Sequence, residues 1–164
     1  MKQRTVQTLF NYWDTVRGGR VAPRRLEIEP SRIAGILAET FMLERVNGGD
    51  WTFRLAGTRL CELFGYELRG TSFLSGWTQQ DRLLLERQMA SVSGEGAVAH
   101  LAIEAGIDAR HRIELEAVLL PLLHTGSTIG RVIGAMSPTS QPDWLDKGRL
   151  TSRRLLRDEL VRLD

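Results

Sequence analysis

Two segments in the second half of the chain alternate between apolar and polar residues, and this alternation constrains the fold more than any other feature of the sequence. The apolar members are Ala99, Leu101, Ile103, Ile113 and Leu115, and the residues beside them are His100, Ala102, Glu104, Arg112, Glu114 and Glu116. A period of two is that of a half-buried β-strand. A turn over 106–110 joins these two strands, and a third strand is predicted over 127–136. The three segments indicate a sheet with one face buried.

The second of these strands becomes apolar at consecutive positions from Ala117, where the sequence is AVLLPLL. Both faces of the sheet are therefore apolar at this point. Pro121 has no N–H to donate to a strand ladder, so it predicts a bulge or an unpaired stretch.

Two further strands are predicted earlier, over 40–46 (TFMLERV) and 51–55 (WTFRL). They are rich in β-branched and aromatic residues. The sequence between them is Asn-Gly-Gly-Asp, and Asn and Gly tolerate the positive φ that a tight hairpin turn requires. We expect the two strands to be antiparallel neighbours.

Helices are predicted between the two groups of strands. A short helix over 58–64 has Thr58 as its N-cap and Gly65 at its end, and a longer helix begins at Thr78 and ends near Gly94 and Gly96. Another short helix begins near Pro30, which suits a first helical turn. Strand groups separated by helices, without a repeating strand–helix unit, indicate an α+β fold with a mainly antiparallel sheet.

The first helix carries an apolar stripe that ends before Gly18-Gly19. Its members, at spacings of three and four, are Val6, Leu9, Phe10, Trp13 and Val16. Two interpretations stay open. The stripe packs on its own domain, or it pairs with a second copy and makes these residues a homodimer interface.

The length of 164 residues predicts one domain with a tail at each end. The divisions are an N-terminal helix and basic linker over 1–25, a domain over 26–140, and a polar tail over 141–164 in which a final helix from Lys147 is one alternative. Six Lys or Arg stand in 1–25 against one acid. The basic charge is not a dense stripe with stacking aromatics, so nucleic-acid binding is the weaker interpretation.

The single cysteine, Cys61, excludes an internal disulfide, and the dispersed histidines 100, 111 and 124 offer no metal-ligand spacing. The chain has no long apolar run and no secretory pattern at its start. These features predict a cytoplasmic protein without a metal site, in which Cys61 packs as a small apolar residue.

The segment FRLAGTRLCELFGYELRGTSF, over 53–73, resembles the PAS domain, with a strand, a turn, a helix ending in Gly65-Tyr66, then Leu68, Gly70 and Phe73. The resemblance extends over roughly 10–140. Within the PAS family, the chain is similar in particular to a group of small stand-alone bacterial PAS-like proteins. The resemblance implies a five-stranded antiparallel sheet that curves around small helices to form a pocket, and a sensory or regulatory role.

Two departures from the family pattern concern cofactors. The region GTSFLSGW lacks the cysteine of the photoreceptor branch, and the long helix DRLLLERQMASV lacks the histidine of haem-binding relatives. Haem and a photoactive flavin adduct are therefore not expected, and any other cofactor stays unknown. Thr58 stands near a position where many PAS domains carry an Asn that braces the turn.

The resemblance places a pocket between the sheet and the helices. Two alternatives stay open: the pocket binds a small ligand, or its own side chains fill it. Its candidate lining residues are Phe53, Leu60, Phe64, Phe73, Trp77, Leu101 and His111. The leading hypothesis is a non-catalytic sensory or regulatory domain that acts through contacts with a signalling protein. The alternatives are a small cone-shaped enzyme with His111 or an inward acid as base, and a nucleic-acid-associated protein.

Overall fold

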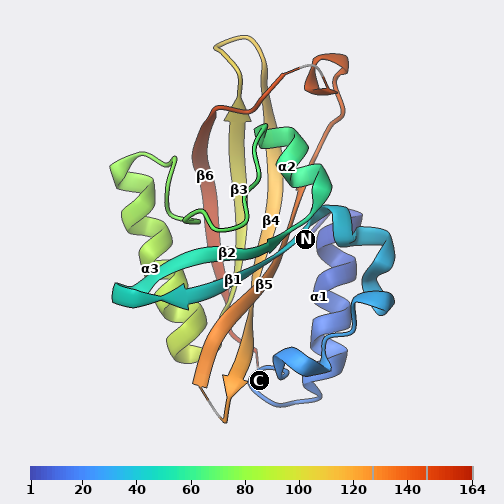
Figure 1. Cartoon of the computed structure of the whole chain (residues 1–164), viewed down its shortest axis with the longest axis vertical. Helices are drawn as coiled ribbons and strands as arrows, with labels where there is room; N and C mark the ends of the chain where they lie inside the picture. The colour runs from blue at the N-terminus through green and yellow to red at the C-terminus, as the bar shows by residue number, and fades with distance from the viewer. Residues whose placement is uncertain (127, 147, 164) are drawn as a thin grey trace.

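The computed structural model describes residues 1–126, 128–146 and 148–163. It is an α+β fold built on a six-stranded antiparallel sheet of order β2-β1-β5-β4-β3-β6 (Figure 1). The strands are β1 (Thr40–Val46), β2 (Asp50–Ala56), β3 (Val98–Gly106), β4 (Arg112–Thr125), β5 (Thr128–Pro138) and β6 (Ser152–Val161). The α-helices are α1 (Arg4–Arg17), α2 (Thr58–Phe64) and α3 (Gln79–Glu95), and a 3₁₀ segment covers Pro30–Glu39.

The predicted strand pairs are confirmed. β1 and β2 form an antiparallel hairpin through Asn47–Gly49, and β3 pairs with β4 in register from Gly106–Arg112 to Ala99–Leu119. Pro121 lies beyond the last pair of β3 with β4, so its missing N–H removes no bond from that ladder. On the other side it pairs with Val132 of β5, and the predicted irregularity lies just after it, between Leu122 and Leu123. The predicted strand start at Ser127 and the alternative helix start at Lys147 fall outside the described residues.

The sheet has six strands, and the prediction of five was wrong. Residues 152–161, expected as a polar tail with a helix as one alternative, form β6, which pairs antiparallel with β3 over Val98–Gly106. The composition RRLLRDEL suits a helix, but β3 offers an unpaired edge, and strand pairing outweighs the weak local propensity. Leu155 and Leu160 then pack against the inner core while Arg154 and Arg157 lie on the other face.

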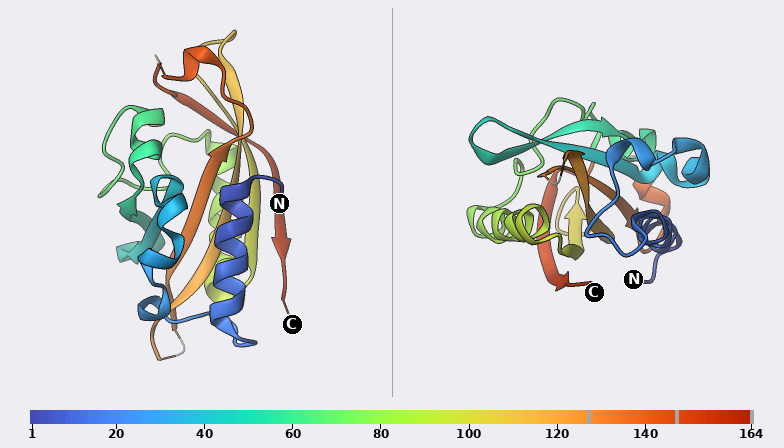
Figure 2. Two further views of the ribbon diagram at one scale, coloured as in Figure 1. Left: turned by 90° about the vertical axis from the view of Figure 1, so that its right-hand side faces the viewer. Right: turned by 90° about the horizontal axis from the view of Figure 1, so that it is seen from below.

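α2 and α3 cover the inner face of the sheet (Figure 2). Leu101, Ile103, Leu115 and Leu119 from the strands pack there with buried helix residues. On α3 these are Leu85, Met89 and Val92, which lie on one face of the helix because they are spaced by four and three residues. Thr78, where this helix was predicted to begin, is its N-cap, and its hydroxyl accepts the N–H of Asp81 at 3.2 Å. The N-cap of α2 is Gly57 and not Thr58, while Gly65 ends it with φ +78° as predicted.

α1 covers the outer face of the sheet, so its apolar stripe is not free to pair with a second copy. Val6, Leu9 and Trp13 are fully buried against Val118 and Leu120 of β4 and neighbouring residues. Phe10 and Val16 lie at the margin and are partly buried. The doubly apolar run of β4 explains this arrangement, because its outward side chains need a cover as much as its inward ones.

Both ends of the chain therefore belong to the same sheet assembly as residues 26–140. The indole Nε1 of Trp13 donates to the carbonyl of Pro121 at 2.8 Å, and the N–H of Leu123 donates to the carbonyl of Pro23 at 2.9 Å. Asp81 on α3 accepts the backbone N–H of Leu155 on β6 at 2.9 Å. None of the helices that the structure describes is long and apolar enough to cross a membrane.

Candidate functional site

The aromatic cavity between the inner face of the sheet and α2 brings together five of the seven residues predicted to line a pocket. They are Phe53, Leu60, Phe64, Phe73 and Trp77. The remaining lining residues are Phe41, Leu68, Ile103, Met136 and Arg153. The free volume is about 10 Å³, which is close to the minimum for one water molecule. The side chains themselves fill this space.

The aromatic rings account for the filling. The ring centres of Phe41, Phe53 and Phe73 lie 5.7 to 6.2 Å from one another, and Trp77 lies 6.4 Å from Phe73. These separations are those of stacked and edge-to-face pairs that stabilise one another directly. A small ligand would enter only if the rings moved apart.

Two predicted lining residues lie elsewhere. Leu101 is buried in the same core but does not line the cavity. His111 lies in the turn between β3 and β4, where its Nδ1 is 2.9 Å from a carboxylate oxygen of Asp108 and its ring packs on Trp144. His111 precedes β4, which begins at Arg112, so it does not share the inward direction of Ile113 and Leu115. The hydrogen bond from His111 lowers the pKa of Asp108, helped by the N–H of Arg110.

Arg153 closes the aromatic cavity, and sequence reasoning missed it. Its guanidinium carbon lies 4.8 Å from the ring centre of Phe64 and 5.8 Å from that of Trp77, within the range of cation–π contacts. It also donates to the hydroxyl of Tyr66 at 3.3 Å. Its position depends on the pairing of β6 with β3, which places Arg153 opposite Ala105 on the inner face.

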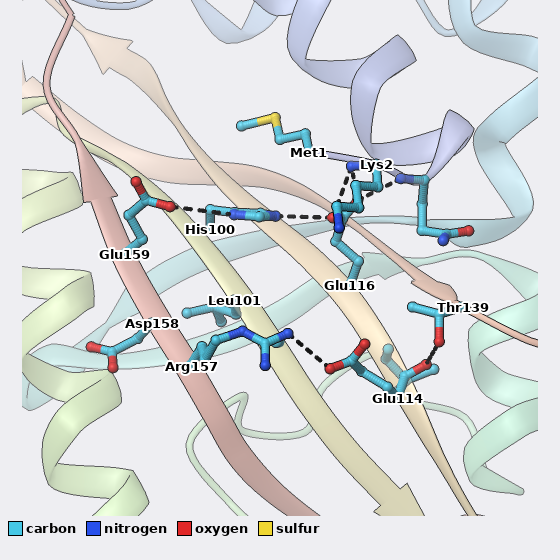
Figure 3. Close-up of a pocket in the computed structure, with 13 residues that line it drawn as sticks. Met1, Lys2, His100, Leu101, Glu114, Glu116, Thr139, Arg157, Asp158 and Glu159 are labelled. Atoms are coloured by element: carbon cyan, nitrogen blue, oxygen red, sulfur yellow. Dashed lines mark hydrogen bonds and ion pairs between the residues drawn. The ribbon is translucent and has the colours of Figure 1, made fainter.

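A larger hollow of about 780 Å³ lies on the outer face of β3, β4 and β6, beside the start of α1 (Figure 3). Its lining residues come from β3, β4 and β6, from Thr139 after β5, and from the first residues of the chain. Those that matter below are His100, Glu114, Glu116, Arg157 and Glu159. The alternation in the sequence predicted that His100, Glu114 and Glu116 point outward. No local sequence pattern predicted that β6 would add Arg157 and Glu159 to the same face.

Glu116 ties the start of the chain to β4. Its carboxylate accepts the backbone N–H of Gln3 at 2.8 Å and that of Lys2 at 2.9 Å, and lies 3.1 Å from Nε2 of His100 (Figure 3). Burial of Glu116 acts to raise its pKa, but these three donors outweigh burial, so the pKa of Glu116 is lowered. Glu116 is therefore a carboxylate at neutral pH and holds α1 in place.

The rest of the outer hollow carries exposed charges of both signs. Arg157 donates to Glu114 at 3.0 Å, and Nδ1 of His100 lies 3.8 Å from Glu159 (Figure 3). Both ring nitrogens of His100 therefore face carboxylates. This arrangement suits recognition of a charged surface more than transfer of a proton to a bound substrate.

Two other chemistries were considered from the sequence. Within the described residues, no group of three or more His, Cys, Asp or Glu side chains is placed to hold a metal ion. Cys61 is partly buried, and its thiol lies 3.6 Å from an oxygen of Glu67. Burial raises the pKa of the Cys61 thiol, with Glu67 acting in the same direction, so the reactive thiolate is disfavoured.

The strand order, the helices on the inner face and the aromatic cavity beside α2 define an α+β domain with an antiparallel sheet. A family model described as PAS domain matches residues 1–137 of the chain. The chain therefore belongs to the PAS domain family, whose members are in general non-catalytic sensory or regulatory domains. A comparison with curated proteins gave no match.

Proposed function

We propose that this chain is a non-catalytic regulatory PAS domain that acts by binding another protein through the outer hollow defined above. The observation that carries the proposal is the open hollow of about 780 Å³ on β3, β4 and β6, set against an aromatic cavity that its own side chains fill. A face of the sheet that α1 leaves uncovered is available to a second chain.

The charges on this face support a specific contact. Arg157 and Glu159 on β6 and Glu114 on β4 are exposed to differing extents, and together they place charges of both signs on this face. Such a pattern steers and selects a protein partner with the opposite arrangement. A second copy of this chain also presents both signs, so homodimerisation stays a prediction, now through this face and not through Val6, Leu9 and Trp13.

The enzyme alternative has weaker support. Among the described residues that line the aromatic cavity, Arg153 alone is ionisable, and an arginine stays protonated and does not act as a base. His111, the base considered from the sequence, packs on Trp144 outside that cavity. A cytoplasmic location and a ligand for the aromatic cavity stay predictions.

Photo-crosslinking tests the proposal. Benzoylphenylalanine at Ala102, in the outer hollow, is expected to form a discrete protein adduct in the cells that make this chain, whereas the same group at Arg87, exposed on α3, is not. Arg157→Glu is expected to reduce the adduct from position 102. Adducts from position 87 alone, or from neither position, would contradict the proposed surface.

Sedimentation of the purified protein separates the two kinds of partner. A dimer that dissociates in Arg157→Glu identifies a second copy as the occupant. A monomer that still forms the adduct at position 102 identifies a different protein. Arg82→Glu, a matched charge reversal on the exposed side of α3, is expected to leave both results unchanged.

A further inference from the structure

A second hollow, of about 420 Å³, lies where the segment after α1 crosses the sheet near β1, β2 and the end of β4. Its lining residues are Arg24, Arg25, Leu26, Glu27, Arg54, His124 and Arg131. Four of the seven are arginines and one is an acid. We call it the arginine hollow. It shares no residue with the outer hollow assigned to protein contact.

Arg131 on β5 is the buried member of this group. Its side chain is 7% exposed, and its Nε and Nη1 make no hydrogen bond to the part of the chain that the structure describes. Nη2 reaches Glu44 at 3.4 Å, which is long for a charge-assisted bond. Burial lowers the pKa of Arg131, and the nearby charge of Arg54 acts in the same direction. A buried guanidinium with so little pairing destabilises the fold.

The acids near Arg131 already have partners. Glu44 also accepts from Arg54 at 2.9 Å. Glu27 accepts two bonds from Arg20, at 2.8 and 3.0 Å, and one from the N–H of Arg24 at 2.8 Å. These bonds lower the pKa of Glu27 to about 2. The arginine hollow therefore keeps a positive excess after its internal ion pairs are made.

An apolar groove of about 290 Å³ adjoins the arginine hollow, and Arg25 and Leu26 line both. The groove runs between the segment 25–37 and β1 and β2. Three of its leucines are exposed large apolar side chains, namely Leu26, Leu37 and Leu55. A cationic hollow joined to an apolar groove matches a ligand that is anionic at one end and apolar at the other.

We propose that the arginine hollow binds the phosphate group of a small soluble phosphate monoester whose apolar part lies in the adjoining groove. Guanidinium groups match phosphate oxygens in geometry. A phosphate group carries two negative charges and can pair with several arginines at once, whereas a carboxylate carries only one charge. The unpaired N–H groups of Arg131 supply the fixed donors, and Arg25 and Arg54 supply the surrounding charge. The site goes beyond the proposed protein contact and does not depend on it.

Calorimetric titration with hexyl phosphate, compared with inorganic phosphate and hexanol at constant ionic strength, tests the site. We expect saturable binding of hexyl phosphate, weaker binding of phosphate and none of hexanol. Arg131→Leu is expected to abolish binding and to raise the Tm of the ligand-free protein by about 2–4 °C, because it removes a poorly paired buried charge. The matched control Arg32→Gln, 70% exposed and outside the hollow, is expected to bind as the natural chain does.

If Arg131→Leu is less stable than the natural chain, Arg131 has a structural role and its loss of binding is not informative. A second variant then tests the site. Arg25→Gln, on the segment after α1, is then expected to weaken hexyl phosphate binding by about tenfold, the effect of one lost charged hydrogen bond. Absence of saturable binding, or equal binding by Arg25→Gln and Arg32→Gln, would overturn the proposal. Binding only to vesicles that contain phosphatidic acid would overturn the assignment to a soluble ligand.

Discussion

The carboxylate of Glu116 on β4 accepts the backbone N–H of Gln3 at 2.8 Å and thereby fixes the start of α1 against the sheet. α1 has no side-chain N-cap of its own, and the carboxylate instead bonds the N–H groups of Gln3, the N-cap residue, and of Lys2 before it. Since a negative charge near a helix N-terminus also interacts favourably with the helix dipole, Glu116 stabilises α1 in two ways.

Glu116→Gln is expected to lower the free energy of unfolding by about 1–3 kcal/mol at neutral pH, because two backbone donors lose a charged acceptor. The pKa of Glu116 in the folded chain lies below its ordinary value of 4.5. Its contribution is therefore complete above that value and is lost as the pH falls through the lowered folded pKa. The measurement is Tm against pH for both chains, which should converge in acid.

Glu159→Gln serves as the control, since Glu159 is 71% exposed and lies 3.8 Å from His100. Its curve is expected to follow that of the natural chain. Parallel curves for the natural chain and Glu116→Gln down to low pH would show that the carboxylate does not hold α1.

Removal of residues 1–19 is expected to destabilise the fold and not merely to change its association. The deletion takes away Val6, Leu9 and Trp13, which are fully buried, and uncovers the outer side of β4. Trp13→Ala alone should cost about 3–5 kcal/mol. Phe10→Ala, at the margin of the same helix, should cost less. Urea unfolding measures both, and an unchanged midpoint for the shortened chain would contradict this account.

Gly134→Ala is expected to destabilise the sheet by about 1–3 kcal/mol through overpacking. Gly134 lies opposite Phe41 across β5 and β1, and a Cβ there would stand 2.4 Å from the ring of Phe41 and 2.7 Å from the carbonyl of Val118. Gly35→Ala is the matched control, because nothing lies within 4 Å of its Cβ position; it should be neutral or stabilising by about 0.4–1 kcal/mol. Equal thermal stabilities of the two variants would count against the packing seen at Gly134.

The strands and their pairing were largely predictable, because alternation and turn chemistry are local properties. The hairpin at Asn47–Gly49 and the β3–β4 pair follow from them. The packing partner of α1 could not be predicted. An apolar stripe such as Val6, Leu9 and Trp13 must be buried, but the stripe itself does not show which surface covers it. The doubly apolar run of β4 was the feature that favoured its own sheet.

The sites were harder to predict because their parts meet through long-range pairing. Phe53, Phe64 and Phe73 were expected together from the family resemblance, and they line the same cavity. Arg153 lies over the cavity because β6 pairs with β3. This pairing was not predicted, since the composition of β6 is typical of a helix. In the same way, only the folded chain shows that Lys2 and Gln3 reach Glu116.

Arg153→Ala is expected to open the aromatic cavity to small apolar molecules. The guanidinium packs over Phe64 and Trp77, and its removal leaves a gap beside a space that now holds about 10 Å³. Engineered apolar cavities of this kind take up ligands such as benzene. Benzene should therefore raise the Tm of Arg153→Ala but not that of the natural chain.

Arg154→Ala provides the comparison. The Arg154 side chain contacts Glu104 on the other face of the sheet and is 58% exposed. A benzene effect of the same size in Arg154→Ala, or none in Arg153→Ala, would show that Arg153 does not close the cavity.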